Sequence, residues 1–230
     1  MNVWSYVKRE DFMDYLINHG IKVFNIHEAA RIFGKPEKYV SIRMSQMPKI
    51  NRAARGIYFI QDTNLSEVAT KIISPSYLSL LSAYAFHGVT TQIPIEYQVM
   101  SPVQHKNMKI NGYQIKFFKL RQDRVFGYSA ASGTIVASIE KAIVDSLYFN
   151  LYTDETLDIL LNYYSEINKE RLIQHGIRMN SKATISRLGY LLETSGYDSD
   201  SLLEYRSQRY VNFGGGGESR SSKWRVNYAE

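Results

Sequence analysis

Apolar residues in the first sixty positions recur at helical spacing in three short segments, and each segment ends at a glycine or a turn residue. The first segment is expected to begin at Ser5, a favourable N-cap, and to end at Gly20. Residues 21–24 have no helical period and are expected to form a short extended link. The pattern therefore predicts three helices near the amino terminus.

The second segment has the clearest helix boundaries in the chain. Asn25 is a favourable N-cap, and Glu28 follows it at the spacing of a capping box. Gly34 is expected to end this helix, because glycine adopts the left-handed conformation of a C-terminal cap at low cost. Pro36 is then expected at the first position of the third helix, after a tight turn.

The third helix is predicted to be amphipathic. At 100° per residue, Val40, Met44 and Met47 lie within about 60° of one another and form its apolar side. The opposite side and its flanks carry small polar, basic and single aliphatic residues: Lys38, Tyr39, Ser41, Ile42, Ser45, Gln46 and Lys49.

A basic loop is expected between this helix and an apolar strand at residues 57–60. Pro48, Asn51 and Gly56 are ordinary turn residues and explain a connection. The loop also carries three cations that no connection requires: Lys49, Arg52 and Arg55. Something other than chain reversal therefore requires positive charge at this position.

Two short helices, a tight turn, a basic loop and a strand are the order of elements in a winged helix-turn-helix. The third helix would lie in the major groove of DNA, and the loop would be the wing that contacts phosphates or the minor groove. The predicted DNA-binding residues are Lys38, Tyr39, Ser41, Ile42, Arg43, Ser45, Gln46, Lys49, Arg52 and Arg55. The alternative is a small three-helix module that uses the same faces for a protein contact.

The charge distribution favours a polyanionic partner. The chain of 230 residues has a net charge of +6, and residues 1–60 contain 10 Lys/Arg against 5 Asp/Glu. Residues 151–230 are nearly balanced, with 10 against 11. Between residues 35 and 55 there are six cations and one acid, Glu37, which is the clustering expected of a nucleic-acid-binding surface. A solvated basic face without a partner remains the simpler alternative.

The sequence as a whole predicts an α+β fold. A winged helix-turn-helix is expected at residues 1–64 and a mixed α/β region at residues 65–230. A buried helix is expected from Ser74 to Gly88, and a hairpin with a type I′ turn at Asn111 and Gly112. Two further helices are expected to begin at the N-caps Ser138 and Thr153, two more are expected at residues 168–176 and 181–196, and a glycine-rich loop follows at Gly214–Gly217.

Several classes of protein are not indicated. The sequence has no cysteine, no run of apolar residues long enough for a membrane span and no export signal, so a cytoplasmic protein without a membrane partner is expected. Its five histidines have no metal-ligand spacing, and no cofactor-binding pattern is present, so no metal, cofactor or enzymatic activity is expected. Ser138 and Lys141 match Ser-x-x-Lys, but the companion motifs of that catalytic pattern are missing.

Four segments resemble the AbiEi family of antitoxin-type transcriptional regulators, in the order in which the family has them. They are "NIHEAARIFGKPEKYVSIRMSQM", "RAARGIYFI", "ISPSYLSLLSAYAFHGVTTQIP" and "GTIVASIEKAIVDSLY", and together they cover roughly residues 20–150. The resemblance implies a winged helix-turn-helix that binds double-stranded DNA at its own promoter and represses a toxin-antitoxin operon. It also implies a second domain that counteracts a nucleotidyltransferase-like toxin encoded nearby, and it assigns no residue to that task.

Two alternatives from other functional classes remain open. A ligand-responsive winged-helix transcription factor without a toxin partner would use Tyr77, Tyr84 and Phe86 as a pocket, although aromatic residues at helical spacing are more often core. An enzyme acting on nucleic acid would need clustered acids or histidines for a metal ion, and the sequence lacks them.

Overall fold

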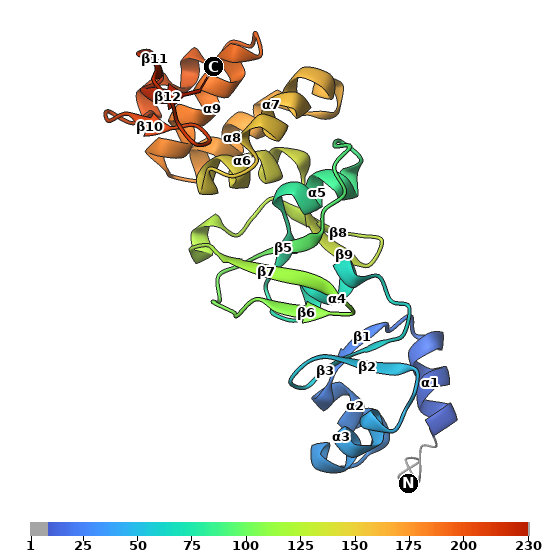
Figure 1. The fold of residues 1–230 in the computed structure, drawn as a ribbon. Helices are drawn as coiled ribbons and strands as arrows, with labels where there is room; N and C mark the ends of the chain where they lie inside the picture. Colours follow the sequence, from blue (N-terminus) through green and yellow to red (C-terminus); the bar gives the residue numbers. More distant parts are fainter. Residues whose placement is uncertain (1–8, 230) are drawn as a thin grey trace. The chain divides into compact units, whose positions relative to one another are not determined.

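The structure is a computed structural model that describes residues 9–229, so Ser5, the expected N-cap of the first helix, lies outside the described residues. The chain divides into two compact units, unit 1 (Met1–Ser74) and unit 2 (Pro75–Glu230) (Figure 1). The helix at Leu65–Lys71 (α4) falls within unit 1, and the domain ranges 1–64 and 65–230 stay a prediction.

Within its described residues, 9–74, unit 1 combines four helices with a three-stranded antiparallel sheet of order β1-β3-β2. Register pairs Val23 with Phe59 between β1 and β3, and Ile50 with Ile60 between β2 and β3. Besides α4, its elements are α1 (Arg9–Asn18), β1 (Val23–Asn25), α2 (Ile26–Phe33), α3 (Glu37–Ser45), β2 (Ile50–Ala54) and β3 (Ile57–Ile60).

The boundaries of α2 are as the sequence predicts. The Asn25 side chain accepts a hydrogen bond from the Glu28 backbone N–H at 2.9 Å, and the Glu28 carboxylate accepts one from the Asn25 N–H at 2.7 Å. Gly34 ends the helix in the left-handed conformation, with φ +58°. The start of α3 differs by one residue, because Pro36 is the N-cap and Glu37 is the first helical residue.

The link expected at residues 21–24 is extended from Val23 on, where strand β1 begins and pairs along its whole length with β3. One expectation for unit 1 is wrong. The basic loop is mostly strand β2, which forms a hairpin with β3 around Arg55 and Gly56. Gly56 has φ +76°, a conformation that L side chains rarely adopt, so the tight turn needs glycine. Strands this short have too few residues to show a clear alternation in sequence.

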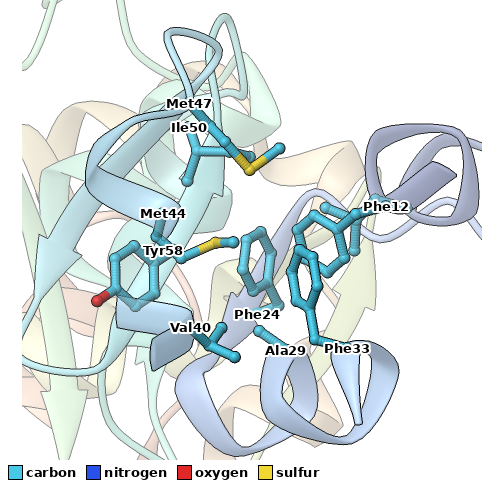
Figure 2. Close-up of a cluster of buried hydrophobic side chains, with 10 residues drawn as sticks. Phe12, Phe24, Ala29, Phe33, Val40, Met44, Met47, Ile50 and Tyr58 are labelled. Carbon is cyan, nitrogen blue, oxygen red and sulfur yellow. The ribbon is translucent and has the colours of Figure 1, made fainter. Parts of the chain in front are cut away.

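The core of unit 1 joins the helices to the sheet, as Figure 2 shows. Phe12 of α1 stacks on Phe33 of α2 with ring centroids 4.5 Å apart, and it meets Phe24 of β1 edge-on at 5.6 Å. Val40 and Met44 of α3 are fully buried in the same cluster. Because full burial of such a side chain contributes about 1.5–3 kcal/mol, α3 is held firmly with its apolar side inward.

Unit 2 contains a six-stranded mixed sheet of order β6-β7-β5-β4-β9-β8. Strand β5 runs parallel to β7 and β4 runs parallel to β9, while the other pairs are antiparallel. Its elements are β4 (Tyr77–Leu78), α5 (Leu80–His87), β5 (Glu96–Ser101), β6 (Met108–Ile110), β7 (Tyr113–Lys119), η1 (Gln122–Arg124), β8 (Tyr128–Ala131), β9 (Thr134–Ala137) and α6 (Ile139–Phe149).

The hairpin prediction for unit 2 is confirmed, and the first helix prediction is partly wrong. Asn111 and Gly112 both have positive φ and connect β6 to β7 in a two-residue turn. The helix expected from Ser74 begins only at Leu80, because residues 77–78 form β4 between β5 and β9. An apolar run without period fits a buried strand and a buried helix equally well, which explains the error.

The carboxy-terminal part of unit 2 packs helices against a small sheet of order β10-β12-β11 (Figure 1). Ser138 caps α6 as expected and Ser181 caps α9, whereas Thr153 is the first residue of α7 rather than its cap. The elements are α7 (Thr153–Asn162), η2 (Tyr164–Glu166), α8 (Lys169–Arg178), α9 (Lys182–Thr194), η3 (Asp200–Tyr205), β10 (Val211–Asn212), β11 (Ser219–Ser221) and β12 (Val226–Tyr228).

The chain thus has a mixed α+β fold, as the sequence predicts. Its longest described helix, α9, has 13 residues, and none of the helices within residues 9–229 has the length and apolar character that a membrane crossing requires.

Candidate nucleic-acid interface

Helix α3 presents a polar and basic outer face because its apolar side is fixed in the core. Val40 and Met44 are 0% and 1% exposed, while Ile42, half a turn away from each, is 56% exposed. An exposed aliphatic side chain is not unusual by itself, since Ile93 and Ile95 are more exposed than Ile42, so Ile42 adds to this surface only through the polar and basic residues beside it. The predicted residues that lie exposed on this helix and just after it are Lys38, Tyr39, Ser41, Ile42, Ser45 and Gln46.

Arg43 is the exception among the predicted residues of α3, because it is only half-exposed. Its guanidinium carbon lies 5.8 Å from the centre of the Tyr39 ring, which restrains the side chain along the helix. Its Nε is buried and has no hydrogen-bond partner among the described residues. Arg43 therefore flanks the outer face rather than occupying its centre.

The two serines of the outer face differ in how they are held. The Ser45 hydroxyl donates to the Ile42 carbonyl at 2.8 Å, so its remaining capacity is that of an acceptor. The Ser41 hydroxyl lies 3.3 Å from the Tyr58 hydroxyl, which links α3 to strand β3. Figure 2 shows that the Tyr58 hydroxyl points away from the aromatic cluster, so the buried ring packs in the core while its oxygen lies on the side of Ser41.

The three cations of the predicted wing are carried by the β2–β3 hairpin, whose register shifts between Arg52 and Ala54. Lys49 precedes β2, Arg52 lies within it opposite Tyr58, and Arg55 lies at the turn. All three are exposed. Arg52 Nε donates to the Ala54 carbonyl at 3.1 Å, which leaves the other guanidinium N–H groups of this residue available for a ligand. The hairpin thus presents its cations from ordered backbone.

The positive charge of this surface is not neutralised within the described part of the chain. Across residues 9–229, no carboxylate lies within ion-pair distance of Lys38, Lys49, Arg52 or Arg55. The acid of this region, Glu37, instead accepts from His27 Nδ1 at 2.5 Å, at the start of α3. Unpaired exposed cations keep their full charge for an anionic partner.

Two residues of this surface were not predicted from the sequence. His27 of α2 contacts Glu37 across the turn between α2 and α3, a pairing that spans ten positions and has no periodic signal. Tyr58 reads as an apolar strand residue, and only the register of the sheet places its hydroxyl beside Ser41. Both residues contact α3 and so help to fix its orientation, and neither contributes to the positive charge of the surface.

The aromatic residues considered for a ligand pocket occupy the core of unit 2 instead. Tyr77 is fully buried and donates to Asp145 at 3.0 Å, and Tyr84 is fully buried and donates to Ser146 at 2.9 Å. Burial raises the pKa of both phenols above the usual value. Phe86 is half-buried at the end of α5. Hydrogen bonds satisfy both hydroxyls, so these tyrosines act as structural residues.

Comparison with known proteins identifies the fold but no family. No family model matches the sequence, and no curated protein matches it. The structure is similar to the crystal structure of the RV2827C protein from Mycobacterium tuberculosis, with a TM-score of 0.64 and 13% sequence identity. The similarity covers 94% of this chain and 89% of that chain. At this identity the comparison shows a shared fold and nothing about function.

Proposed function

We propose that unit 1 is a winged helix-turn-helix and that the protein is a DNA-binding transcriptional regulator that acts on its own promoter. The observation that carries this proposal is the outer surface of α3 and the β2–β3 hairpin, which exposes cations without ion-pair partners among residues 9–229, together with small polar side chains and Ile42. The order α2, α3, β2, β3 matches the order of elements in that fold.

Helix α3 has the chemistry needed for the major groove. A helix with its side chains is about 10–12 Å across, and the major groove is about 12 Å wide. Ser41, Ser45 and Gln46 can hydrogen-bond to base edges, and Ile42 can contact a thymine methyl group. Lys38 can reach a phosphate at the groove edge. The buried side of α3 keeps these groups in a fixed array, as sequence readout requires.

The β2–β3 hairpin is then the wing. Arg52 and Arg55 would contact phosphates or enter the adjacent minor groove, where narrow A·T-rich segments attract arginine. Contacts of this kind position the protein on the duplex but carry little sequence information. The hairpin and α3 therefore have separable roles in affinity and in specificity.

We further propose that the protein is an antitoxin that represses a toxin-antitoxin operon and counteracts a nucleotidyltransferase-like toxin. This part rests on the resemblance of four segments to the AbiEi family. The compact division of the chain supports it, because unit 2 has a core of its own and can carry a task that unit 1 does not.

Salt dependence tests the role of the wing. Binding of the full chain to its promoter should weaken steeply with salt, with a log-log slope near −0.9 for each phosphate neutralised. Arg52→Ala with Arg55→Ala should weaken binding to all duplexes similarly and should reduce the slope by up to about 2. The matched control is Lys109→Ala with Lys182→Ala, which removes two exposed cations from unit 2. Normal binding by the wing variant would refute the wing assignment.

Sequence preference tests the role of α3. Ser41→Ala or Ser45→Ala should reduce the preference for the promoter over a shuffled duplex and leave the salt slope unchanged, because neither serine carries charge. A change in slope without a change in preference would place these serines against the phosphates and would contradict the proposed orientation of α3.

Growth rescue tests the antitoxin role. The full chain and the Arg52→Ala/Arg55→Ala variant are expressed from promoters unrelated to the operon, together with the toxin. Both should protect, because repression cannot contribute to protection under these promoters. Protection by the wild-type chain alone would show that it depends on DNA binding, and absence of protection by either would favour a regulator without a toxin partner.

A further inference from the structure

The small carboxy-terminal sheet has one face on a helix and one face in solvent. Its inner face packs on α9, where the Tyr190 ring lies 5.1 Å from the Phe213 ring and 4.9 Å from the Tyr228 ring. Trp224 and Val226 are fully buried. Since side chains of a strand alternate between faces, the residues between these positions face outward.

The outward face carries two arginines, a tyrosine and two asparagines. The guanidinium carbons of Arg220 and Arg225 lie 5.6 and 5.4 Å from the centre of the Tyr210 ring. Asn227 Nδ2 donates to Asn212 Oδ1 at 3.1 Å, and register places Asn227 opposite Arg220. Tyr210, Asn212 and Arg220 are exposed. We call these five residues the Arg–Tyr face.

The charge around the Arg–Tyr face is positive and mostly unpaired. Residues 206–228 contain five cations and one acid, Glu218. Lys223 is paired with Glu193 and Asp200, at 2.5 and 2.9 Å. Within the described residues, no carboxylate forms an ion pair with the four arginines Arg206, Arg209, Arg220 and Arg225. The total charge of residues 151–230 does not show this local excess of cations, because helices elsewhere in that range are acidic.

Arg225 contacts the Tyr210 ring from the residue position before β12. It has φ +57°, in the left-handed region that glycine or asparagine enters at lower cost. Its guanidinium carbon lies over the Tyr210 ring from this position.

We propose that the Arg–Tyr face binds single-stranded nucleic acid. Guanidinium planes and aromatic rings stack on unpaired bases, arginines bind phosphates, and asparagine amides offer donors and acceptors to base edges. A duplex hides the faces of its bases, so planar groups such as Tyr210 would gain little from it. Strands of two or three residues span about 10 Å, which fits a site of two or three nucleotides.

This inference is independent of the proposed duplex-binding surface of unit 1, and the experiment separates the two. The full chain with Arg52→Ala and Arg55→Ala serves as the background, so that the wing contributes little. Fluorescence anisotropy then measures its binding to labelled oligonucleotides of about 12 nucleotides, a length within the usual range of single-strand sites. The probes are single-stranded RNA, single-stranded DNA and a duplex of the same sequence, with polyglutamate as the competitor that lacks bases.

The single strands should bind at least about tenfold more tightly than the duplex, and Tyr210→Ala or Arg220→Ala should each weaken that binding about tenfold. Tyr210→Phe keeps the ring and should bind normally, and Lys109→Ala controls for the loss of an exposed cation. Tighter binding of single-stranded RNA than of single-stranded DNA would indicate a contact to the 2′-hydroxyl. Equal binding of the two would indicate that the face contacts only bases and phosphates.

Three results would overturn the proposal. Equal or tighter binding of the duplex that falls with Arg220→Ala would make the face a duplex contact, whereas duplex binding that Arg220→Ala leaves unchanged belongs to unit 1. Equal competition by polyglutamate would make it a site for acidic protein segments. Unchanged single-strand binding by Arg220→Ala, an exposed residue whose loss cannot disturb the core, would show that the face is not used. Thermal unfolding of each variant confirms that the sheet is intact.

Discussion

Replacing Asp145 by asparagine removes one charge of an ion pair that is completely buried in unit 2. The Lys141 ammonium contacts the Asp145 carboxylate one helical turn away, and both side chains are 0% exposed. The carboxylate also accepts from Tyr77 at 3.0 Å and from Ser79 at 2.8 Å. The ammonium lies 4.6 Å from the centre of the Phe126 ring. The pair belongs to a buried hydrogen-bonded network that also contains Tyr77 and Ser79.

The expected cost follows from which charge remains. Asp145→Asn leaves a buried ammonium without its counter-ion, and breaking a buried pair in this way costs about 3–5 kcal/mol in unfolding free energy. Lys141→Met combined with Asp145→Asn removes both charges at similar volume and should cost only about 1–2 kcal/mol. The double variant should therefore be more stable than Asp145→Asn alone by at least about 2 kcal/mol.

Alkaline pH should reduce the cost of the single substitution. Burial lowers the pKa of Lys141 below its ordinary value of 10.5. The unfolded chain then binds more protons than the folded chain between the lowered pKa and 10.5, so this group makes stability rise with pH in that window. Without Asp145 the ammonium loses its proton more easily, and the deficit of Asp145→Asn should shrink between pH 7 and pH 9.

Urea unfolding measures these differences, with circular dichroism and the fluorescence of Trp224, which is buried in unit 2, as probes. Lys182→Met is the matched control, because Lys182 is exposed and its replacement should change stability by less than about 0.5 kcal/mol. A double variant as unstable as the sum of its single variants would refute the reasoning. So would an Asp145→Asn variant that loses less than about 1 kcal/mol.

Two further predictions concern packing and protonation in unit 2. A Cβ atom on Gly189 would lie 2.1 Å from Trp224 Cζ3, so Gly189→Ala should lower unfolding free energy by about 1–3 kcal/mol, whereas Gly215→Ala, with open space around it, should change it little in the same thermal melt. Burial lowers the pKa of His175 below 6.5; because the unfolded chain then binds the proton more readily, the contribution of His175 to stability should fall as pH drops below 6.5 and should be constant above it. His175→Gln should remove this part of the pH dependence in urea unfolding at pH 5 and pH 7.5, and an unchanged pH profile would contradict the assignment.

Local signals explain what the sequence could predict. The capping box of α2 involves residues three positions apart, and the turn at Asn111 and Gly112 involves adjacent ones, so both are visible without tertiary information. The buried side of α3 follows from a period of three to four residues. The exposed side of α3 was predicted as the side opposite the apolar residues. Such a prediction does not resolve residues at the border between the two sides, and Arg43, restrained by Tyr39, is one of these.

Elements that depend on distant partners could not be predicted. Strands β1 and β4 are too short for an alternation signal and exist because β3, β5 and β9 supply their hydrogen bonds. The Arg–Tyr face was missed for a related reason. Tyr210 and Arg220 meet only through the register of the small sheet, and the balanced charge of residues 151–230 conceals their surroundings.

Competition between promoter DNA and a shuffled duplex of equal length and composition tests the proposed regulator most directly. At about 0.15 M salt the full chain should bind its own promoter at least about 10³-fold more tightly than the shuffled duplex, as specific regulators do. Arg52→Ala with Arg55→Ala should weaken both affinities and largely preserve their ratio. Equal affinity of the wild-type chain for the two duplexes would contradict sequence-specific recognition by α3 and, with it, the assignment of unit 1 as the DNA-reading part of a regulator.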